Sequence, residues 1–177
     1  MINEEIIDIY NEFKNKTGRT KIRNKEKLEI GEYILGVQAI IINSENQILI
    51  TKRSEFKKAY PLKWECNGGA VLAGEDSLDG LVREMTEELG INLNKEEALY
   101  LKTVKTNNNI KDIYLVKKDI EINDLKFDDG EVVDAKWVDI NEYMNMFNSG
   151  EIVPNVDFIY DDYEKSMEIF SNICKCK

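Results

Sequence analysis

The stretch NGGAVLAGEDSLDGLVREMTEELGI, residues 67–91, constrains the fold of this chain more than any other segment. After the glycines, apolar residues recur at the spacing that places them on one face of an α-helix: Leu78, Leu81, Val82, Met85 and Leu89. Asp76 or Ser77 can cap the start of this helix, and Gly90 can close it. The segment therefore predicts a glycine-rich loop and then a helix over residues 76–89 that packs one face against a core.

The predicted helix also carries three carboxylates, Glu84, Glu87 and Glu88, within a sector of roughly 100° beside its apolar face. Like charges at this spacing cost about 0.2–0.5 kcal/mol per pair in an isolated helix. Taken alone, such a cluster is most often a solvated surface. The preceding glycines let the backbone approach a ligand closely, which favours an all-oxygen site for a hard cation such as Mg²⁺ or Mn²⁺.

The spacing of this segment resembles a family signature. Gly69 is followed after five residues by Glu75, and after seven more by REMTEELGI. This resembles the Nudix hydrolase signature G-x5-E-x7-R-E-U-x-E-E-x-G-U, in which U is a bulky aliphatic residue. The chance of filling its fixed positions at random is on the order of 10⁻⁸ per window. The residues that fill them are Gly69, Glu75, Arg83, Glu84, Glu87, Glu88 and Gly90, with Met85 and Ile91 at the aliphatic positions.

The resemblance implies an α/β fold, an α/β/α sandwich with a mixed β-sheet and a loop–helix–loop metal site. It implies hydrolysis of a diphosphate linkage in a nucleoside diphosphate joined to another group, with Mg²⁺ as cofactor and Mn²⁺ as a substitute. Glu84, Glu87 and Glu88 are the implied metal ligands, helped by the carbonyl of Gly69. Arg83, grouped with the catalytic residues, and Glu75 are implied to orient the loop and helix, a role more architectural than catalytic.

The charge and the composition agree with metal-assisted chemistry. The formal net charge is −10, so a diphosphate would be repelled unless cations bridge it to the protein. The chain has no histidine, which excludes a Ser-His-Asp or Cys-His site and imidazole metal ligands. Metal-bound water can then attack phosphorus. Two candidates for the general base stay open, Glu84 and the loop residue Glu131, which has Asp128 and Asp129 nearby and is equally well explained as a loop acid.

The segment before the signature concentrates positive charge in an acidic chain. Arg53, at the end of a predicted strand, is the candidate for a bidentate contact with a substrate phosphate. Lys57 and Lys58 are interpreted as solvated loop residues. Cys66 is expected to be a small buried residue rather than a proton donor.

The pattern around WEC and TGRT resembles a subgroup close to isopentenyl-diphosphate isomerase, but the histidines of those enzymes are missing. Two alternatives to a hydrolase therefore stay open. The first is an isomerase-like enzyme acting on an isoprenoid diphosphate. The second is a non-catalytic nucleotide sensor.

The rest of the chain predicts one domain over residues 1–177, with an N-terminal hairpin extension (1–31), a core (32–150) and a C-terminal helix (151–177). Residues 1–31 are ambiguous, because Ile6, Tyr10 and Phe13 also fit a helix, whereas NKTGRT is typical of a turn between strands. The other expected elements are strands over residues 33–42, 48–50, 98–106, 110–119 and 131–140, and helices over residues 140–147 and 157–174.

Three cysteines, Cys66, Cys174 and Cys176, favour a reducing compartment, and no secretory signal or membrane span is visible, so a cytoplasmic location is expected. The acidic charge argues against binding to a nucleic acid polymer or a membrane. The expected partner is a small diphosphate-containing substrate. The family resemblance also favours a homodimer, and a metal role for the C-terminal Cys-x-Cys is not favoured.

Overall fold

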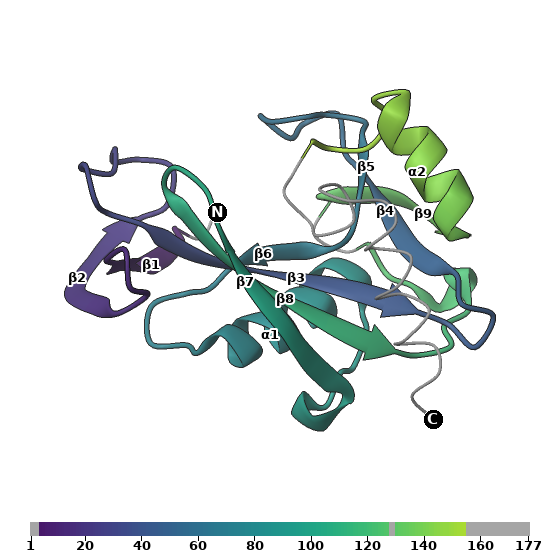
Figure 1. The fold of residues 1–177 in the computed structure, drawn as a ribbon, viewed down its shortest axis with the longest axis horizontal. Helices are drawn as coiled ribbons and strands as arrows, with labels where there is room; N and C mark the ends of the chain where they lie inside the picture. The colour runs from purple at the N-terminus through teal and green to yellow at the C-terminus, as the bar shows by residue number, and fades with distance from the viewer. Residues whose placement is uncertain (1–3, 128–129, 155–177) are drawn as a thin grey trace.

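The computed structural model describes residues 4–127 and 130–154 of the 177-residue chain. Its elements are, in chain order, β1 (Ile6–Tyr10), β2 (Lys16–Ile22), β3 (Ile34–Ile42), β4 (Ile48–Arg53), β5 (Trp64–Glu65), β6 (Gly68–Ala70), α1 (Ser77–Leu89), β7 (Ala98–Lys105), β8 (Asn109–Lys117), β9 (Val132–Val138) and α2 (Ile140–Asn148). The β1–β2 hairpin lies at one end of the molecule and α2 lies at the other (Figure 1).

A mixed sheet forms the centre of the fold, as expected. Its main strand order is β5-β4-β3-β8-β7, with β6 paired to β3 and β9 paired to β4. Strands β3 and β8 run parallel, and the other pairs are antiparallel. Strands β3 and β4 pair only next to their turn, at Ile42 and Ile48; farther along, β3 pairs with β6 and β4 with β9. The two central strands therefore diverge toward the end of the sheet where Arg53 and Gly68 lie.

Both faces of the sheet are covered, which confirms the α/β/α sandwich. Alternate residues of a strand point to opposite faces. On β3, Val37, Ala39 and Ile41 belong to the apolar cluster that contains Leu81, Met85 and Leu89 of α1. Ile40 and Ile42 belong to a second cluster that contains Tyr143 and Met146 of α2. The near-continuous apolar sequence of β3 is thus explained by burial on both sides.

Helix α1 begins and ends where the sequence predicts. The side chain of Asp76 accepts a hydrogen bond from the backbone N–H of Asp79, so Asp76 is the N-cap. Gly90 has φ 67°, a left-handed conformation that favours glycine. The N–H groups of Gly90 and Ile91 donate to the carbonyls of Thr86 and Met85, each at 3.0 Å, which closes the helix. These caps fix the register of the carboxylates on α1.

The N-terminal residues form a hairpin, so the helical alternative for Ile6, Tyr10 and Phe13 is wrong. The chain reverses at residues 11–15, and most of NKTGRT lies in β2 instead of forming the turn. Burial explains why a strand forms here. Ile7, Ile9 and Tyr10 are at most 4% exposed, and Ile7 and Ile9 are two residues apart, so both point to the same buried side of a strand. The hairpin contacts the loop before α1: the N–H of Ala73 donates to the carbonyl of Ile6 at 2.8 Å, and that of Gly74 donates to Asp8 at 3.0 Å.

The other expected strands and the helix over residues 140–147 are confirmed at β3, β4, β7, β8, β9 and α2. The sequence did not predict β5 and β6, which are two and three residues long. The helix expected at 157–174, with Cys174 and Cys176, and the residues Asp128 and Asp129 lie outside the described residues.

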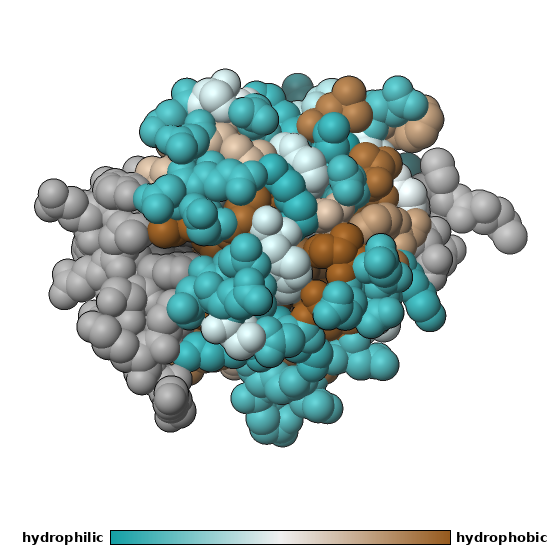
Figure 2. Space-filling view, turned by 90° about the vertical axis from the view of Figure 1, so that its right-hand side faces the viewer, coloured by the Kyte–Doolittle hydropathy of each residue, from teal (hydrophilic) through white to brown (hydrophobic). Residues whose placement is uncertain are grey.

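One face of the molecule shows how polar and apolar side chains are distributed on the surface. The face in Figure 2 is largely hydrophilic, with hydrophobic side chains gathered in small patches between polar ones. No helix that the structure describes is both long and apolar enough to cross a bilayer.

Candidate active site

Helix α1, strand β6, the end of β4 and the β1–β2 hairpin surround a cavity of about 430 Å³, which we call the acidic cavity. It brings together side chains from distant parts of the sequence. The residues that line it are Glu5, Arg23, Arg53, Lys57, Gly68, Gly69, Glu84, Glu87, Glu88 and Glu131. The three predicted metal-ligand glutamates, both candidate bases and the candidate phosphate-binding arginine therefore share one cavity.

Gly69 lies against the carboxyl group of Glu84. A β-carbon at position 69 would sit closer to the carboxyl atoms of Glu84 than real β-carbons approach any neighbour. A β-carbon on Gly68 would likewise collide with the backbone of Val37 and Gln38. The glycine pair is therefore required for strand β6 to pass between β3 and the buried end of Glu84.

Arg83 organises this side of the cavity. Its guanidinium donates from Nε to Glu75 Oε1 at 2.8 Å, from Nη1 to Glu84 at 3.0 Å and to Glu87 at 2.8 Å, and from Nη2 to the carbonyl of Ala70 at 2.6 Å. Burial alone would lower the pKa of Arg83, but the hydrogen bond to Glu75 and the neighbouring carboxylates outweigh it and hold the pKa above its ordinary value. Arg83 does not line the cavity, so its contacts favour the orienting role over the catalytic one.

Glu84 and Glu88 are buried, whereas the side chain of Glu87 is 55% exposed. Burial raises the pKa of Glu84, and the charge of Arg83 and its hydrogen bond only partly offset this. Glu88 accepts a hydrogen bond from the amide of Asn67 at 2.5 Å, and Asn67 in turn accepts one from Thr51. The alternative that the cluster is a solvated helix face is therefore wrong for Glu84 and Glu88.

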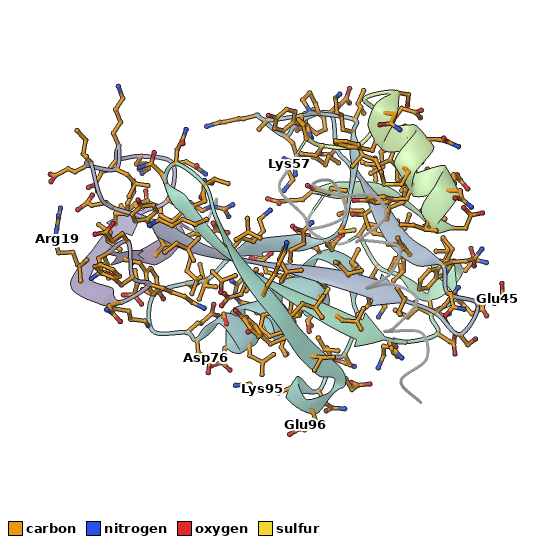
Figure 3. All side chains as sticks on the ribbon, viewed as in Figure 1. Arg19, Glu45, Lys57, Asp76, Lys95 and Glu96 are labelled. Carbon is orange, nitrogen blue, oxygen red and sulfur yellow. The ribbon has the colours of Figure 1, made fainter. Side chains whose placement is uncertain are left out.

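Lys57 was expected to be a solvated loop residue, and the structure corrects this. Its side chain is only 21% exposed, its ammonium contacts Glu131, and it lies 3.9 Å from Glu88 Oε1. In Figure 3, Lys57 points from the loop after β4 toward the interior of the molecule. Burial lowers the pKa of Lys57, the charge of Glu88 opposes this, and Arg53 adds to it. Lys58, by contrast, is exposed, as expected.

Glu131 reaches the cavity from the loop before β9. The N–H of Ser54, next to Arg53, donates to the carbonyl of Glu131 at 2.8 Å, which fixes this loop beside the end of β4. The Glu131 side chain is 48% exposed. Both candidate bases thus lie at the cavity, Glu84 buried and Glu131 partly open to solvent.

The backbone of β6 distinguishes two candidate carbonyl ligands. The N–H of Ala39 donates to the carbonyl of Asn67 at 2.8 Å, and that of Val71 donates to the carbonyl of Leu35 at 3.0 Å. Since hydrogen-bonded pairs alternate along an antiparallel ladder, the carbonyl of Gly69 is directed toward β3 and that of Gly68 away from it. The structure therefore favours Gly68 over the expected Gly69 as the carbonyl that faces a ligand.

Arg53 is partly engaged with the protein. Its Nε donates to the carbonyl of Ala59 at 3.1 Å, and its Nη1 pairs with Glu65. Arg53 also lines a second cavity of about 380 Å³, which we call the adjacent cavity. Its walls include Leu35, Val37, Cys66 and Ala70, with Thr106, Asn109 and Lys111 on one side. Cys66 is 2% exposed and lies within 3.9 Å of the Tyr143 hydroxyl, as expected for a small buried residue.

The donor set of the acidic cavity fits a hard divalent cation, because carboxylate and carbonyl oxygens are the ligands that Mg²⁺ and Mn²⁺ prefer. Within residues 4–127 and 130–154, no three acidic or cysteine side chains are arranged closely enough to hold a metal ion together. Arg83 holds Glu84 and Glu87, while Asn67 and Lys57 contact Glu88. Arg83 and Lys57 therefore already neutralise part of the negative charge that a metal ion would neutralise.

Comparisons of the sequence with a family model and with known proteins agree on one family. A family model described as the NUDIX domain matches residues 32–156. An uncharacterized Nudix hydrolase of Listeria monocytogenes is 34% identical over 148 residues, covering 83% of this chain and 87% of that protein. An isopentenyl-diphosphate Delta-isomerase of Escherichia coli is 26% identical over 112 residues, covering 60% of this chain and 62% of that protein, so likeness to the isomerases is weaker.

The fold is also similar to solved structures. The crystal structure of DR0079 from Deinococcus radiodurans matches with a TM-score of 0.72 and 21% identity, over 97% of this chain and 99% of that one. This likeness extends beyond the residues matched by the family model and includes the N-terminal hairpin region. At this identity it supports the fold alone.

Proposed function

The chain belongs to the Nudix family of pyrophosphohydrolases, and we propose that it uses Mg²⁺ to cleave the diphosphate linkage of a nucleoside di- or triphosphate or of a nucleoside diphosphate derivative. The observation that carries the proposal is that the carboxylates of α1 and of the loop before β9 converge on one cavity beside a glycine pair: Glu84, Glu87, Glu88 and Glu131. A diphosphate cannot enter this acidic cavity unless cations balance its charge.

Each residue would have a distinct role. Glu84, Glu87 and Glu88 would hold the cation, with a carbonyl of the glycine pair. When bound, the metal supplies a charge that neutralises phosphate oxygens and lowers the pKa of a coordinated water. Arg83 and Glu75 keep the loop and the helix in register. Arg53 orients the phosphate, since a guanidinium can offer two parallel N–H donors to it.

Exposure supports Glu131 over Glu84 as the general base. A general base must be deprotonated and within reach of a water molecule. The side chain of Glu131 is 48% exposed and contacts the ammonium of Lys57, so water can reach it, whereas Glu84 is buried and burial raises its pKa. We therefore assign the base to Glu131 and a metal-ligand role to Glu84.

The test is turnover of a substrate panel with Mg²⁺, comprising nucleoside di- and triphosphates, dinucleotides, sugar nucleotides and isoprenoid diphosphates. Products would be identified by mass in water enriched in ¹⁸O. We expect cleavage with one ¹⁸O in a phosphate product, and a loss of at least about 10²-fold in turnover for Glu87→Gln. Glu96→Gln, at an exposed position outside the cavity, is the matched control and should keep wild-type turnover.

The same panel separates the two alternatives. An isomerase would convert an isoprenoid diphosphate without a change in mass or release of phosphate. A nucleotide sensor would bind members of the panel without turning any over, and a Glu87→Gln variant that kept its full biological effect would support that role. Either result would overturn the proposed hydrolysis.

A further inference from the structure

The β1–β2 hairpin contributes two charged residues to the acidic cavity: Glu5, just before β1, and Arg23, just after β2. Neither lies in the signature or in the residues matched by the family model. The backbone N–H of Arg23 donates to the carbonyl of Glu5 at 2.8 Å, and the guanidinium Nη1 contacts Glu5 Oε2 at 2.6 Å. These contacts hold Arg23 at the open end of the hairpin, beside the cavity.

Arg23 lies at the junction between the acidic cavity and the adjacent cavity. Four residues line both cavities: Arg23, Arg53, Gly68 and Gly69. A molecule that extends from the carboxylates into the adjacent cavity must pass these four residues. Two of them are guanidinium side chains, which bind phosphate oxygens through several N–H donors.

The hydrogen-bonding capacity of Arg23 is largely unused. A guanidinium has five N–H donors. Arg83 uses its donors on Glu75, Glu84, Glu87 and the carbonyl of Ala70, which is the pattern of a structural residue. Within residues 4–127 and 130–154, the side chain of Arg23 forms a hydrogen bond and an ion pair only with Glu5, and it remains 35% exposed. Arg23 can therefore bind a ligand without breaking a network that holds the fold together.

The hairpin is fixed in place by other residues. Asp8 forms an ion pair with Lys16 at 2.7 Å and accepts from the N–H of Gly74 at 3.0 Å, and Lys16 also donates to the carbonyl of Glu75 at 3.2 Å. These contacts attach the hairpin to the loop before α1. Arg23 is thus positioned relative to the carboxylates before any ligand binds, which reduces the entropy lost on binding.

We propose that Arg23 is a substrate-binding residue supplied by the N-terminal hairpin, and that Arg23 and Arg53 together bind one phosphate of an organic diphosphate at the junction. The other phosphate then lies at the carboxylates, and the organic group lies in the adjacent cavity. This inference rests on the proposed function and deepens it, because it names how the substrate spans the two cavities.

The test measures phosphate binding separately from metal binding. Mn²⁺ is first titrated alone into wild type and into Arg23→Ala by calorimetry, and methylenediphosphonate, which is not hydrolysed, is then titrated at saturating Mn²⁺. We expect Mn²⁺ affinity in Arg23→Ala to be no lower than in wild type, and a Kd for methylenediphosphonate that rises at least about tenfold, with partial rescue in Arg23→Lys. On a substrate that wild type cleaves, KM should rise by a similar factor while kcat changes less.

Arg19→Ala is the matched control. Arg19 lies in β2 of the same hairpin, pairs with Glu32 at the surface and lines neither cavity, and Figure 3 shows it at the outer edge of the hairpin. The change in net charge is the same, so an equal loss of affinity in Arg19→Ala would overturn the assignment. So would wild-type affinity in an Arg23→Ala protein whose melting temperature is unchanged.

The outcomes distinguish this inference from the proposed function. If wild type cleaves a member of the panel but Arg23→Ala binds and cleaves it equally well, only the role of Arg23 is overturned. If wild type neither cleaves the panel nor binds methylenediphosphonate, the proposed function is overturned and the inference with it.

Discussion

The backbone of Gly69 lies so close to the carboxyl group of Glu84 that no side chain fits between them. Strand β6 brings the glycine to this position by pairing with β3, and the caps of α1 bring the glutamate. The glycine of the signature is therefore explained by packing against a specific carboxylate, in addition to any role of its carbonyl.

Gly69→Ala should displace Glu84 and weaken both metal binding and the fold. The added methyl group must push the carboxylate or β6 aside, which costs about 1–3 kcal/mol of unfolding free energy. We expect a loss of at least about tenfold in Mn²⁺ affinity by calorimetry, with the far-ultraviolet circular dichroism unchanged. Wild-type affinity would show that Glu84 does not need its observed position.

Arg83→Ala should destabilise the protein strongly. Its side chain is 18% exposed and is bound to Glu75, Glu84 and Glu87, so its removal leaves buried negative charge without a partner. The expected loss is about 3 kcal/mol of unfolding free energy in urea. Lys95→Ala, which removes an ion pair to Asp79 at the surface, is the control and should leave the unfolding midpoint unchanged.

Lys57→Met should tighten metal binding. The ammonium lies between Glu88 and Glu131, so a cation entering the cavity must compete with it and with its charge. In calorimetry on the metal-free proteins, we expect Mn²⁺ affinity to be about three- to tenfold higher in Lys57→Met than in wild type. Lys58→Met removes the same charge from an exposed position and should change the affinity much less. Equal effects in the two variants would attribute the gain to net charge alone.

The stability of the metal-free protein should depend on pH through Glu84. Burial raises the pKa of Glu84 above its ordinary value of 4.5, so the folded state binds this proton more tightly than the unfolded state does. The contribution is therefore fully present below pH 4.5 and is lost as the pH rises through the folded-state pKa. Urea unfolding in a chelator should show that Glu84→Gln gains stability relative to wild type between pH 4.5 and 7.5. A constant difference across this range would contradict the role of burial.

Much of the fold could be predicted from the sequence, because its signals are local. The helix over Ser77–Leu89 has apolar periodicity and both caps within one segment, and the apolar runs of β3 and β8 have the composition of buried strands. The N-terminal hairpin was ambiguous, since the spacing of Ile6, Tyr10 and Phe13 suits a helix until burial by the rest of the protein is known. Short strands such as β5 and β6 carry too few residues for any periodicity.

The parts of the site that could not be predicted depend on contacts between distant segments. Lys57 lies in an irregular loop, and its partner Glu131 is far away in the sequence, so nothing local distinguishes it from Lys58. Arg23 reaches the cavity only because the hairpin is attached to the loop before α1. The preference for the Gly68 carbonyl over that of Gly69 depends on the register of β6 against β3. Such features follow from strand pairing, which a sequence pattern does not specify.

The most direct test of the central claim is the uptake of Mg²⁺ or Mn²⁺ by the metal-free protein, measured by calorimetry in wild type and in Glu88→Gln. Glu88 is chosen because its side chain is only 10% exposed in the acidic cavity and the amide of glutamine keeps its shape. The account predicts saturable binding in wild type and a loss of at least about tenfold in affinity in the variant, at an unchanged melting temperature. Absence of binding by wild type, or equal affinity in the two proteins, would contradict it.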